Sequence, residues 1–242
     1  MNKTQTIEFE ILTEIKRICM KEDIPFQLAY GSLLGCIREK GFIPWDEDID
    51  IMVWGKDYER FCEAIKLNIS DSIQLFINSS ANEYELLFAR VGVKGNTHFN
   101  THVDVFPFSG APEKKVNQYW FQKAVYLIFR AYFAKKIKLR DYSSNRVEKR
   151  ILLIIVKAVL FIFSPKLLRT LHKWLAERYD PYKTGFACNV CGSYGFREIL
   201  PFEYIESSAN GVFEGDEFPV PQNSHLYLSH FYGDYMTPRK TV

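Results

Sequence analysis

The alternation of apolar and polar residues predicts short helices and strands in the first quarter of the chain. Ile7, Ile11, Ile15 and Ile18 recur at helical spacing, which predicts an amphipathic N-terminal helix. Residues 26–30 form an apolar run that favours a short strand. Residues 46–53 place acids between apolar side chains with a period of two, which is typical of a strand.

Apolar and polar residues continue to alternate in recognisable patterns up to the end of the chain. A helix is predicted for 56–68, and a hairpin is predicted for 72–79 with 83–93. Residues 101–108 alternate as another strand. Further elements are expected at 119–133 and 147–179 (helical, with a break at Ser164-Pro165), at 213–221 (a hairpin turning at Gly215) and from 222 (a helix ending at Gly233). The pattern therefore predicts an α+β protein with a mixed β-sheet core flanked by helices.

Length and composition limit the possible classes of protein. A chain of 242 residues suits a single domain spanning 1–242, and its net charge of +2 gives no general tendency to bind polyanions. The N-terminus lacks the pattern of an export signal. Five scattered cysteines favour buried thiols in a reducing compartment, so we expect a cytoplasmic protein. The lone C-x-x-C of Cys188 and Cys191 has no second pair, so a structural zinc ion is not expected.

Charge is distributed unevenly, and this singles out residues 114–183 as a basic helical insertion. The segment contains 17 Lys and Arg against four Asp and Glu, a formal charge of +13 that leaves −11 for the rest of the chain. Two interpretations stay open. The helices rest on an anionic membrane surface at the inner membrane face, or they form a helical subdomain with a buried apolar side and an ordinary basic exterior. Binding to nucleic acid is not expected, because no reading motif accompanies the charge.

The candidate chemistry lies in residues 29–53. Asp48 and Asp50 would share one face of the predicted strand, where their mutual repulsion is relieved by a divalent cation. Mg²⁺ suits such carboxylates together with substrate phosphates, and Mn²⁺ is the alternative. Upstream, Gly31 forms a turn and Ser32 is predicted to cap a helix whose first amides would bind phosphate. An ordinary capped helix beside a solvated acidic strand is the competing interpretation.

A second strand supplies further candidates. In residues 101–108, His102 and Asp104 share one face, and Asp104 is a candidate third carboxylate for a metal ion or for proton transfer. His102 is a minor candidate for an acid or base near the acceptor. Arg38 and Arg90 are candidates to stabilise phosphate charge, although Arg90 has an ion pair as its competing role.

Several motifs together resemble the LicD/fukutin family of phosphotransferases. They are 31–35 (GSLLG), Arg38, 41–50 (GFIPWDEDID), 102–107 (HVDVFP), 213–221 (FEGDEFPVP) and 232–236 (YGDYM). The motifs bracket nearly the whole chain. One departure is Glu47, which stands where the family usually has aspartate.

The resemblance implies a nucleotidyltransferase-like fold. It also implies transfer of a phospho-alcohol, such as phosphocholine or ribitol phosphate, from a CDP-linked donor to a hydroxyl of a glycan or lipid-linked glycan. Asp48, Asp50 and Asp104 would then be the metal-binding and catalytic residues. Gly31, Ser32, Arg38, Asp46, Arg90 and His102 would bind substrate. The alternatives are a nucleotidylyltransferase that releases pyrophosphate and a non-catalytic glycan-assembly protein at the membrane surface.

Overall fold

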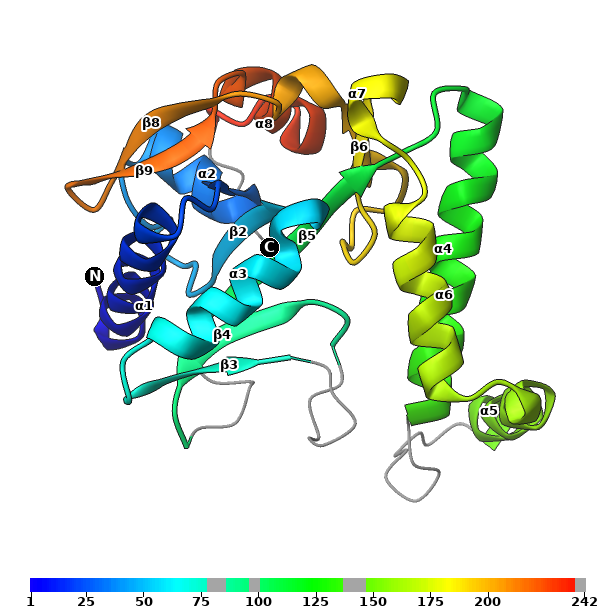
Figure 1. Cartoon of the computed structure of the whole chain (residues 1–242). Helices are drawn as coiled ribbons and strands as arrows, with labels where there is room; N and C mark the ends of the chain where they lie inside the picture. The colour runs from blue at the N-terminus through cyan, green and yellow to red at the C-terminus, as the bar shows by residue number, and fades with distance from the viewer. Residues whose placement is uncertain (78–85, 96–100, 137–146, 238–242) are drawn as a thin grey trace.

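A mixed sheet forms the centre of the protein, and the computed structural model describes residues 1–77, 86–95, 101–136 and 147–237 (Figure 1). Within these residues β2 and β5 are parallel, whereas every other pair of neighbouring strands is antiparallel. In spatial order the strands are β1 (Phe26–Leu28), β2 (Ile49–Trp54), β5 (His102–Gly110), β4 (Ala89–Val93) and β3 (Ile73–Phe76), with β6 (Phe186–Asn189) on β5 and β7 (Ile199–Pro201) on β6. The predicted α+β class is confirmed.

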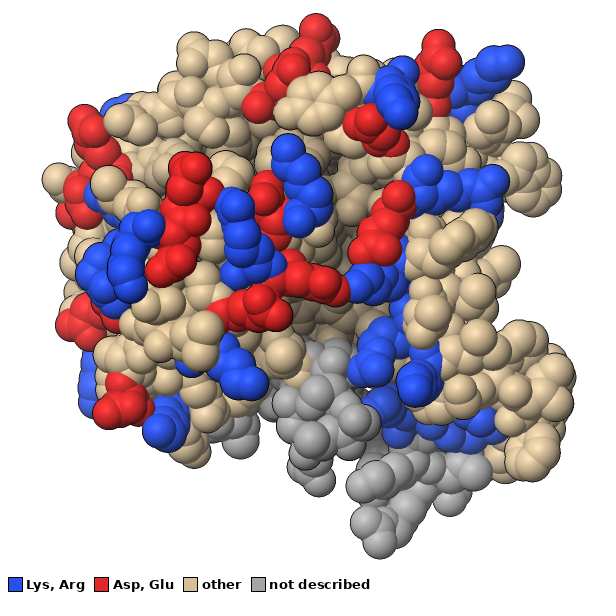
Figure 2. Space-filling view, viewed as in Figure 1, with Lys and Arg blue, Asp and Glu red and all other residues tan. Residues whose placement is uncertain are grey.

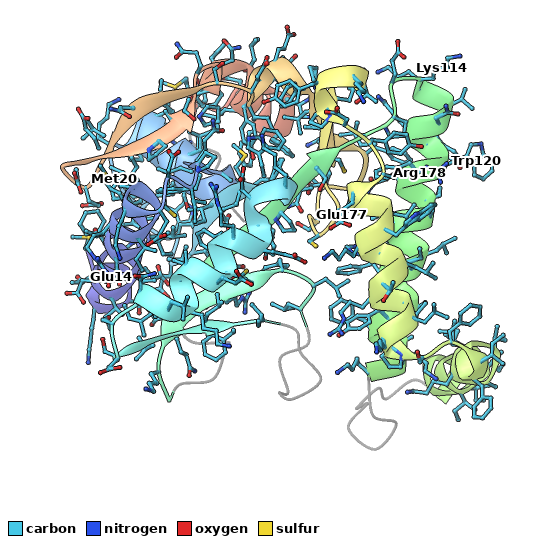
Figure 3. All side chains as sticks on the ribbon, in the orientation of Figure 1. Glu14, Met20, Lys114, Trp120, Glu177 and Arg178 are labelled. Atoms are coloured by element: carbon cyan, nitrogen blue, oxygen red, sulfur yellow. The ribbon has the colours of Figure 1, made fainter. Side chains whose placement is uncertain are left out.

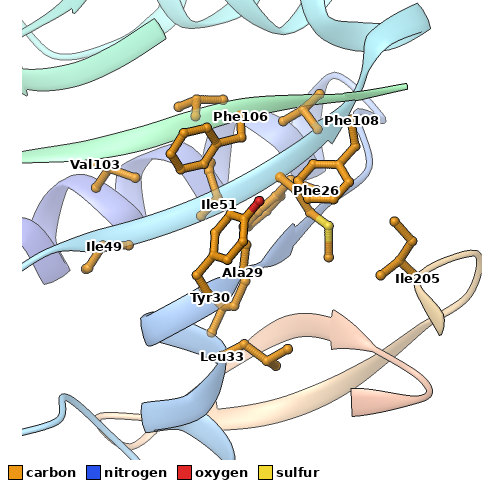
Figure 4. Close-up of a cluster of buried hydrophobic side chains, with 14 of the residues drawn as sticks. Phe26, Ala29, Tyr30, Leu33, Ile49, Ile51, Val103, Phe106, Phe108 and Ile205 are labelled. Carbon is orange, nitrogen blue, oxygen red and sulfur yellow. The ribbon is translucent and has the colours of Figure 1, made fainter. Parts of the chain in front are cut away.

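Helices cover both faces of this sheet. Helices α1 (Lys3–Lys21) and α3 (Gly55–Asn68) lie over one face, as Figure 1 shows, and both were predicted from helical spacing. Helix α2 (Tyr30–Arg38) lies over the opposite face, where the ring of Tyr30 is 5.6 Å from that of Phe106 (Figure 4). Helix α8 (Ser224–Tyr232) packs beside α2 and ends at Gly233 as predicted.

Both predicted hairpins are present. Strands β3 and β4 pair antiparallel, and the connection between them at residues 78–85 lies outside the described residues. Strands β8 (Ser208–Phe213) and β9 (Asp216–Pro221) form a separate two-stranded sheet. Glu214 and Gly215 both have positive φ, at 51° and 86°, which is the conformation that a tight two-residue hairpin turn requires.

A helical arm separates the neighbouring strands β5 and β6. It consists of α4 (Lys115–Lys136), α5 (Val147–Val159), the 3₁₀ helix η1 (Leu160–Ile162), α6 (Pro165–Glu177) and α7 (Pro181–Thr184). The predicted break is where the sequence places it, because Ser164 accepts a hydrogen bond from the Leu167 N–H and Pro165 starts α6. Short 3₁₀ helices η2 (Gly195–Glu198) and η3 (Phe202–Tyr204) follow β6 and β7.

Two predicted boundaries near the acidic residues are wrong. The strand predicted for 46–53 begins only at Ile49, because the backbone of Asp46 is used elsewhere: its N–H donates to the Ile43 carbonyl at 2.9 Å and its carbonyl accepts from the Gln5 side chain at 2.9 Å. Ser32 does not cap α2, because that helix begins at Tyr30 and the N-cap position is Ala29. The hydroxyl of Ser32 is used elsewhere, as the next section describes.

All five cysteines are free thiols, as the sequence suggested. Four of them are buried and Cys62 is half-buried. Burial raises the pKa of the Cys19 thiol to about 12, so this thiol stays protonated and unreactive at neutral pH.

Candidate active site

Three neighbouring strands place charged side chains in one row across the sheet. Asp50 on β2 is the register partner of Asp104 on β5, and Asp104 is in turn the partner of Arg90 on β4. Directly opposed residues point to the same face of a sheet, so the three side chains are neighbours. The structure therefore brings together two acids and one of the arginines that the sequence singled out.

Arg90 forms a two-pronged ion pair with Asp104. Its Nε lies 2.5 Å from Oδ1 and its Nη2 lies 3.1 Å from Oδ2, while Nε2 of His102 is 3.3 Å from the same Oδ1. The side chains of Arg90 and Asp104 are only 14% and 13% exposed. Burial raises the pKa of Asp104, although the hydrogen bonds and charge of Arg90 oppose this effect.

Asp50 carries the least compensated charge of the row. Among the described residues no hydrogen bond to its carboxylate is found, and burial, followed by the nearby charges of Asp104 and Asp48, holds its pKa well above the usual range. Its backbone is firmly held. The Asp50 N–H donates to the Ser32 hydroxyl at 2.7 Å, and its carbonyl accepts from the Ala29 N–H at 2.9 Å. Ser32 thus fixes the strand that presents Asp50.

Asp46 and Asp48 precede β2 and lie beside the start of α2. Asp48 is exposed and Asp46 is half-buried. A Cβ atom at Gly31 would lie only 2.7 Å from Oδ2 of Asp46, so a larger residue at position 31 would force the Asp46 carboxylate to move. Burial and the charge of Asp48 raise the pKa of Asp46. The first turn of α2 therefore faces a carboxylate, which the partial positive charge of a helix N-terminus favours.

The link between β1 and α2 is strained. Tyr30, the first residue of α2, has a φ of 43°, which is unusual for a residue other than glycine. Such a conformation costs about 1–3 kcal/mol and persists where the surroundings impose it. Here the Tyr30 hydroxyl donates to Glu198 at 2.6 Å and accepts from the Asn189 side chain at 2.9 Å. Among the described residues no hydrogen-bond acceptor is found for the N–H groups of Gly31 and Ser32 in the first turn of α2.

Arg38 does not join this group. It lies at the last residue of α2, about 10 Å along the helix from Gly31. Its guanidinium donates to the Tyr235 carbonyl at 2.9 Å and to the Glu39 carboxylate at 2.7 Å. These contacts connect α2 to the C-terminal segment.

The chemistry of these donors fits a magnesium ion. Within the described parts of the chain no three His, Cys, Asp or Glu residues are arranged closely enough to hold an ion by themselves. Mg²⁺ does not need such a cage, because it is usually bound by one or two carboxylates, water and substrate phosphates. The uncompensated carboxylate of Asp50, with Asp48 two residues before it, supplies hard oxygen ligands of the required kind.

Comparison with known proteins agrees with this arrangement. The family model described as "LicD/FKTN/FKRP, nucleotidyltransferase domain" matches residues 23–148, just over half of the chain and the part that contains the row of charged side chains. The chain belongs to the LicD/FKTN/FKRP family. The resemblance seen in the motifs is thereby confirmed.

Two curated proteins are similar to this LicD-family chain. Lipopolysaccharide cholinephosphotransferase LicD of Haemophilus influenzae is 28% identical over 251 residues, covering 98% of this chain and 91% of the relative. Ribitol 5-phosphate transferase FKRP of Mus musculus is 34% identical over 88 residues, which cover 35% of this chain and 17% of the relative.

The family motif at residues 213–221 makes contacts with segments next to the acidic residues, not with the acidic residues themselves. The Glu214 carboxylate accepts the Phe42 N–H at 2.9 Å, which braces the loop leading to the acidic segment. Asp216 instead pairs with Lys16 at 2.9 Å. These contacts give both acids a structural use in this LicD-family domain.

Sequence analysis missed Glu8, a buried acid behind the site. Glu8 on α1 is 1% exposed, and among the described residues its Oε2 has no hydrogen-bond partner. Burial and the charge of Asp48 raise the pKa of Glu8 to about 8, against a hydrogen bond from the His102 N–H that lowers it. One turn earlier, the Gln5 side chain donates to the Asp46 carbonyl at 2.9 Å. Residues 5 and 8 are three apart and share one face of α1, and this spacing is the only feature of the sequence that links Glu8 to the contact between Gln5 and Asp46.

Glu198 is a second buried acid without a sequence signal. It is fully buried, and it accepts the Tyr30 hydroxyl and, at 2.9 Å, the Tyr194 N–H. Burial raises the pKa of Glu198 to about 7. Tyr194 stacks on Tyr30 with ring centroids 5.6 Å apart. Burial and, to a smaller extent, the charge of Asp50 raise the pKa of Tyr194, so this pair of rings lies near the acidic site.

A cavity of about 530 Å³ lies on the face of the sheet that carries α3, opposite to the face of Asp50 and Asp104. Its walls come from α3, β4, β5 and α6 and include Tyr58, Ala89 and Pro107. None of the four site aspartates lines it. The acidic site is therefore separate from this cavity.

Proposed function

We propose that this protein transfers a phospho-alcohol from a CDP-linked donor to a hydroxyl group of a glycan in a magnesium-dependent reaction. The observation that carries the proposal is the pairing of Asp50 with Asp104 beside the first turn of α2, within a LicD-family domain. It is supported by the names of two relatives, one a cholinephosphotransferase and the other a ribitol 5-phosphate transferase. Phosphocholine and ribitol phosphate are accordingly the first groups to test.

In the proposed reaction the acceptor hydroxyl attacks the phosphorus that bears the alcohol. A new phosphorus–oxygen bond forms, the phosphoanhydride bond breaks, CMP leaves, and the hydroxyl proton passes to a base. A magnesium ion held by Asp48 and Asp50 would neutralise charge on the phosphoryl oxygens. The Gly31 and Ser32 amides bind donor phosphate, and Ser32 keeps Asp50 in place through its backbone.

In the proposed site, Asp104 and Arg90 lie on the side where the acceptor hydroxyl binds. Their ion pair favours the ionised form of Asp104 against the effect of burial and orients its carboxylate, so Asp104 can serve as the base or can join the ligands of a metal ion that substrate phosphate helps to hold. Nε2 of His102, 3.3 Å from Oδ1 of Asp104, helps to orient this carboxylate. We place the reaction in the cytoplasm, in keeping with the free buried thiols, with a free or lipid-linked glycan as the acceptor.

The test is product analysis with the purified protein. It is incubated with Mg²⁺ and CDP-choline, CDP-ribitol or CDP-glycerol, with and without EDTA, and released CMP is measured. The proposal expects CMP from one donor, abolished by EDTA and by Asp48→Ala. The exposed Asp234→Ala, near the C-terminal end of α8, is the matched control and retains activity.

Two results would contradict the proposal. Release of pyrophosphate from CTP, in place of CMP from a CDP-alcohol, would indicate a nucleotidylyltransferase. Absence of magnesium-dependent binding to any cytidine nucleotide would indicate a protein without this catalysis.

A further inference from the structure

Helix α5 and the following η1 carry an apolar stripe that faces solvent. The stripe follows helical spacing from residue 151 to residue 162, and its side chains are 49–80% exposed. Its members are Ile151, Ile154, Ile155, Val159, Phe161 and Ile162. In a water-soluble helix the apolar stripe normally faces the core, so this orientation needs a partner.

The two long helices of the arm bury part of their apolar residues against each other, although Trp120, Leu127 and Trp174 are also exposed. Helix α6 packs along α4 and buries Leu168, Leu175 and Ala176. Helix α5 lies across the far end of this pair, away from the sheet (Figure 1). Its described polar contact is made by Lys157, whose Nζ donates to the Lys135 carbonyl at 3.2 Å, and Figure 3 shows described side chains of α5 that extend away from the pair of α4 and α6. The stripe is therefore not required by the fold of the arm.

The charge around the stripe is predominantly positive. Glu148 is the one acid in the sequence of α5, and residues 149–176 contain no Asp or Glu. Basic side chains lie at the end of α4 and at the start of α6, and Figure 2 shows Lys and Arg gathered beside the uncharged surface at this corner. Lys135 and Lys136 lie in the last turn of α4, Lys157 in the last turn of α5 and Lys166 in the first turn of α6. A second copy of this chain would bring like charges together, whereas an anionic surface would be attracted.

The length of the helix excludes a membrane-spanning role. Helix α5 has 13 residues and so is about 20 Å long, which is shorter than the roughly 30 Å hydrocarbon core of a bilayer. Over the described residues no helix combines the length and the apolar character needed to cross a membrane. An apolar stripe flanked by lysines is typical of a helix that lies in the interface of a membrane.

We propose that α5 and η1 form a docking surface for an anionic phospholipid membrane. The apolar stripe enters the boundary between headgroups and acyl chains, and the surrounding lysines contact lipid phosphates. Of the two interpretations that the basic segment left open, the exposed stripe favours the membrane. This inference does not depend on the transfer reaction, because it concerns a surface at the other end of the arm.

Vesicle co-sedimentation tests the proposal. The full chain is mixed with vesicles of phosphatidylcholine alone or with about 30% phosphatidylglycerol, as wild type and as the double variant Phe161→Glu/Ile162→Glu. Wild type is expected to bind the anionic vesicles at least about tenfold more tightly than the neutral ones, and the double variant is expected to lose at least about tenfold. The control is Leu67→Glu on α3, where the side chain is 81% exposed but isolated, and it binds as wild type does.

A second variant tests the charge. Lys136→Glu/Lys166→Glu is expected to reduce binding to anionic vesicles while leaving the weak binding to neutral vesicles unchanged. Circular dichroism and thermal unfolding verify that each variant is folded.

Three outcomes would overturn the proposal. In the first, wild type binds neither vesicle. In the second, the double variant binds as wild type does. In the third, a wild-type dimer becomes monomeric in the double variant without vesicle binding, which would make the stripe an interface between copies. Because no nucleotide is present, none of these outcomes bears on the transferase proposal, and failure of CMP release would not affect this one.

Discussion

Replacing Glu8 by glutamine tests whether a buried acid on α1 is coupled to the acidic segment. The folded protein keeps a proton on Glu8 up to about pH 8, whereas the ordinary pKa of a glutamate is 4.5. Since the folded state binds this proton more tightly, its stability is complete below pH 4.5 and decreases as the pH rises to 8. Each pH unit in this range costs about 1.4 kcal/mol. Glutamine stays uncharged in both states and removes the loss.

The magnitude follows directly. At pH 8 the free energy of unfolding of Glu8→Gln is expected to exceed that of wild type by about 4 kcal/mol. At pH 5 the difference is expected to be about 1 kcal/mol or less, because the unfolded chain retains part of its protons there. Urea unfolding at pH 5, 6.5 and 8 measures both values. Glu10→Gln, an exposed position on the same helix, controls for the loss of a carboxylate from α1.

A difference in unfolding free energy that does not change with pH would refute this reasoning. So would a Glu8→Gln protein that is less stable than wild type at pH 8. Asp48→Asn gives an independent check. Removing this neighbouring negative charge is expected to flatten the pH dependence of wild type, but only in part, since burial is the larger cause of the raised pKa.

Three further substitutions probe the geometry of the site. Ser32→Ala removes the acceptor for the Asp50 N–H, so urea unfolding is expected to show a free energy of unfolding lowered by about 1 kcal/mol. Unchanged stability would contradict the role of Ser32 in holding the backbone of Asp50. Gly31→Ala forces its Cβ against Asp46, so kcat/KM for the CDP-linked donor is expected to fall at least about tenfold, and wild-type kinetics would refute the close approach. Arg90→Lys keeps the positive charge but loses the paired hydrogen bonds to Asp104 on β5. Steady-state kinetics should therefore show kcat reduced by about tenfold or more. Full activity would show that the positive charge alone is sufficient.

The sequence predicts those parts of the fold that depend on local periodicity. The isoleucines of α1 and the turn at Gly215 needed only neighbouring residues to be found. The pairing of Arg90 with Asp104 depends on the register between β4 and β5, which no local pattern reveals. The partner of the Ser32 hydroxyl likewise lies 18 residues away, on another strand. Local reasoning therefore assigned Ser32 to a helix cap.

Burial is the second property that periodicity does not reveal. Glu8 lies one turn before Ile11 and reads as a polar residue on an amphipathic helix, yet it is 1% exposed. The stripe on α5 shows the reverse, because its apolar pattern is that of a core-facing helix although Phe161 is 80% exposed. In both cases the neighbours that decide burial come from distant parts of the chain.

The most direct test of the central claim is the rate of CMP release by Asp50→Asn compared with wild type, together with the thermal stability of both. The account predicts that CMP release falls by about a thousandfold or more. It also predicts that the melting temperature at pH 7 rises, because the change replaces a half-buried carboxyl, whose charged form is disfavoured by burial and by the charges of Asp104 and Asp48, with a neutral amide. Full activity in a folded variant, or lost activity with a lowered melting temperature, would contradict the role of Asp50 as the charged centre of the site.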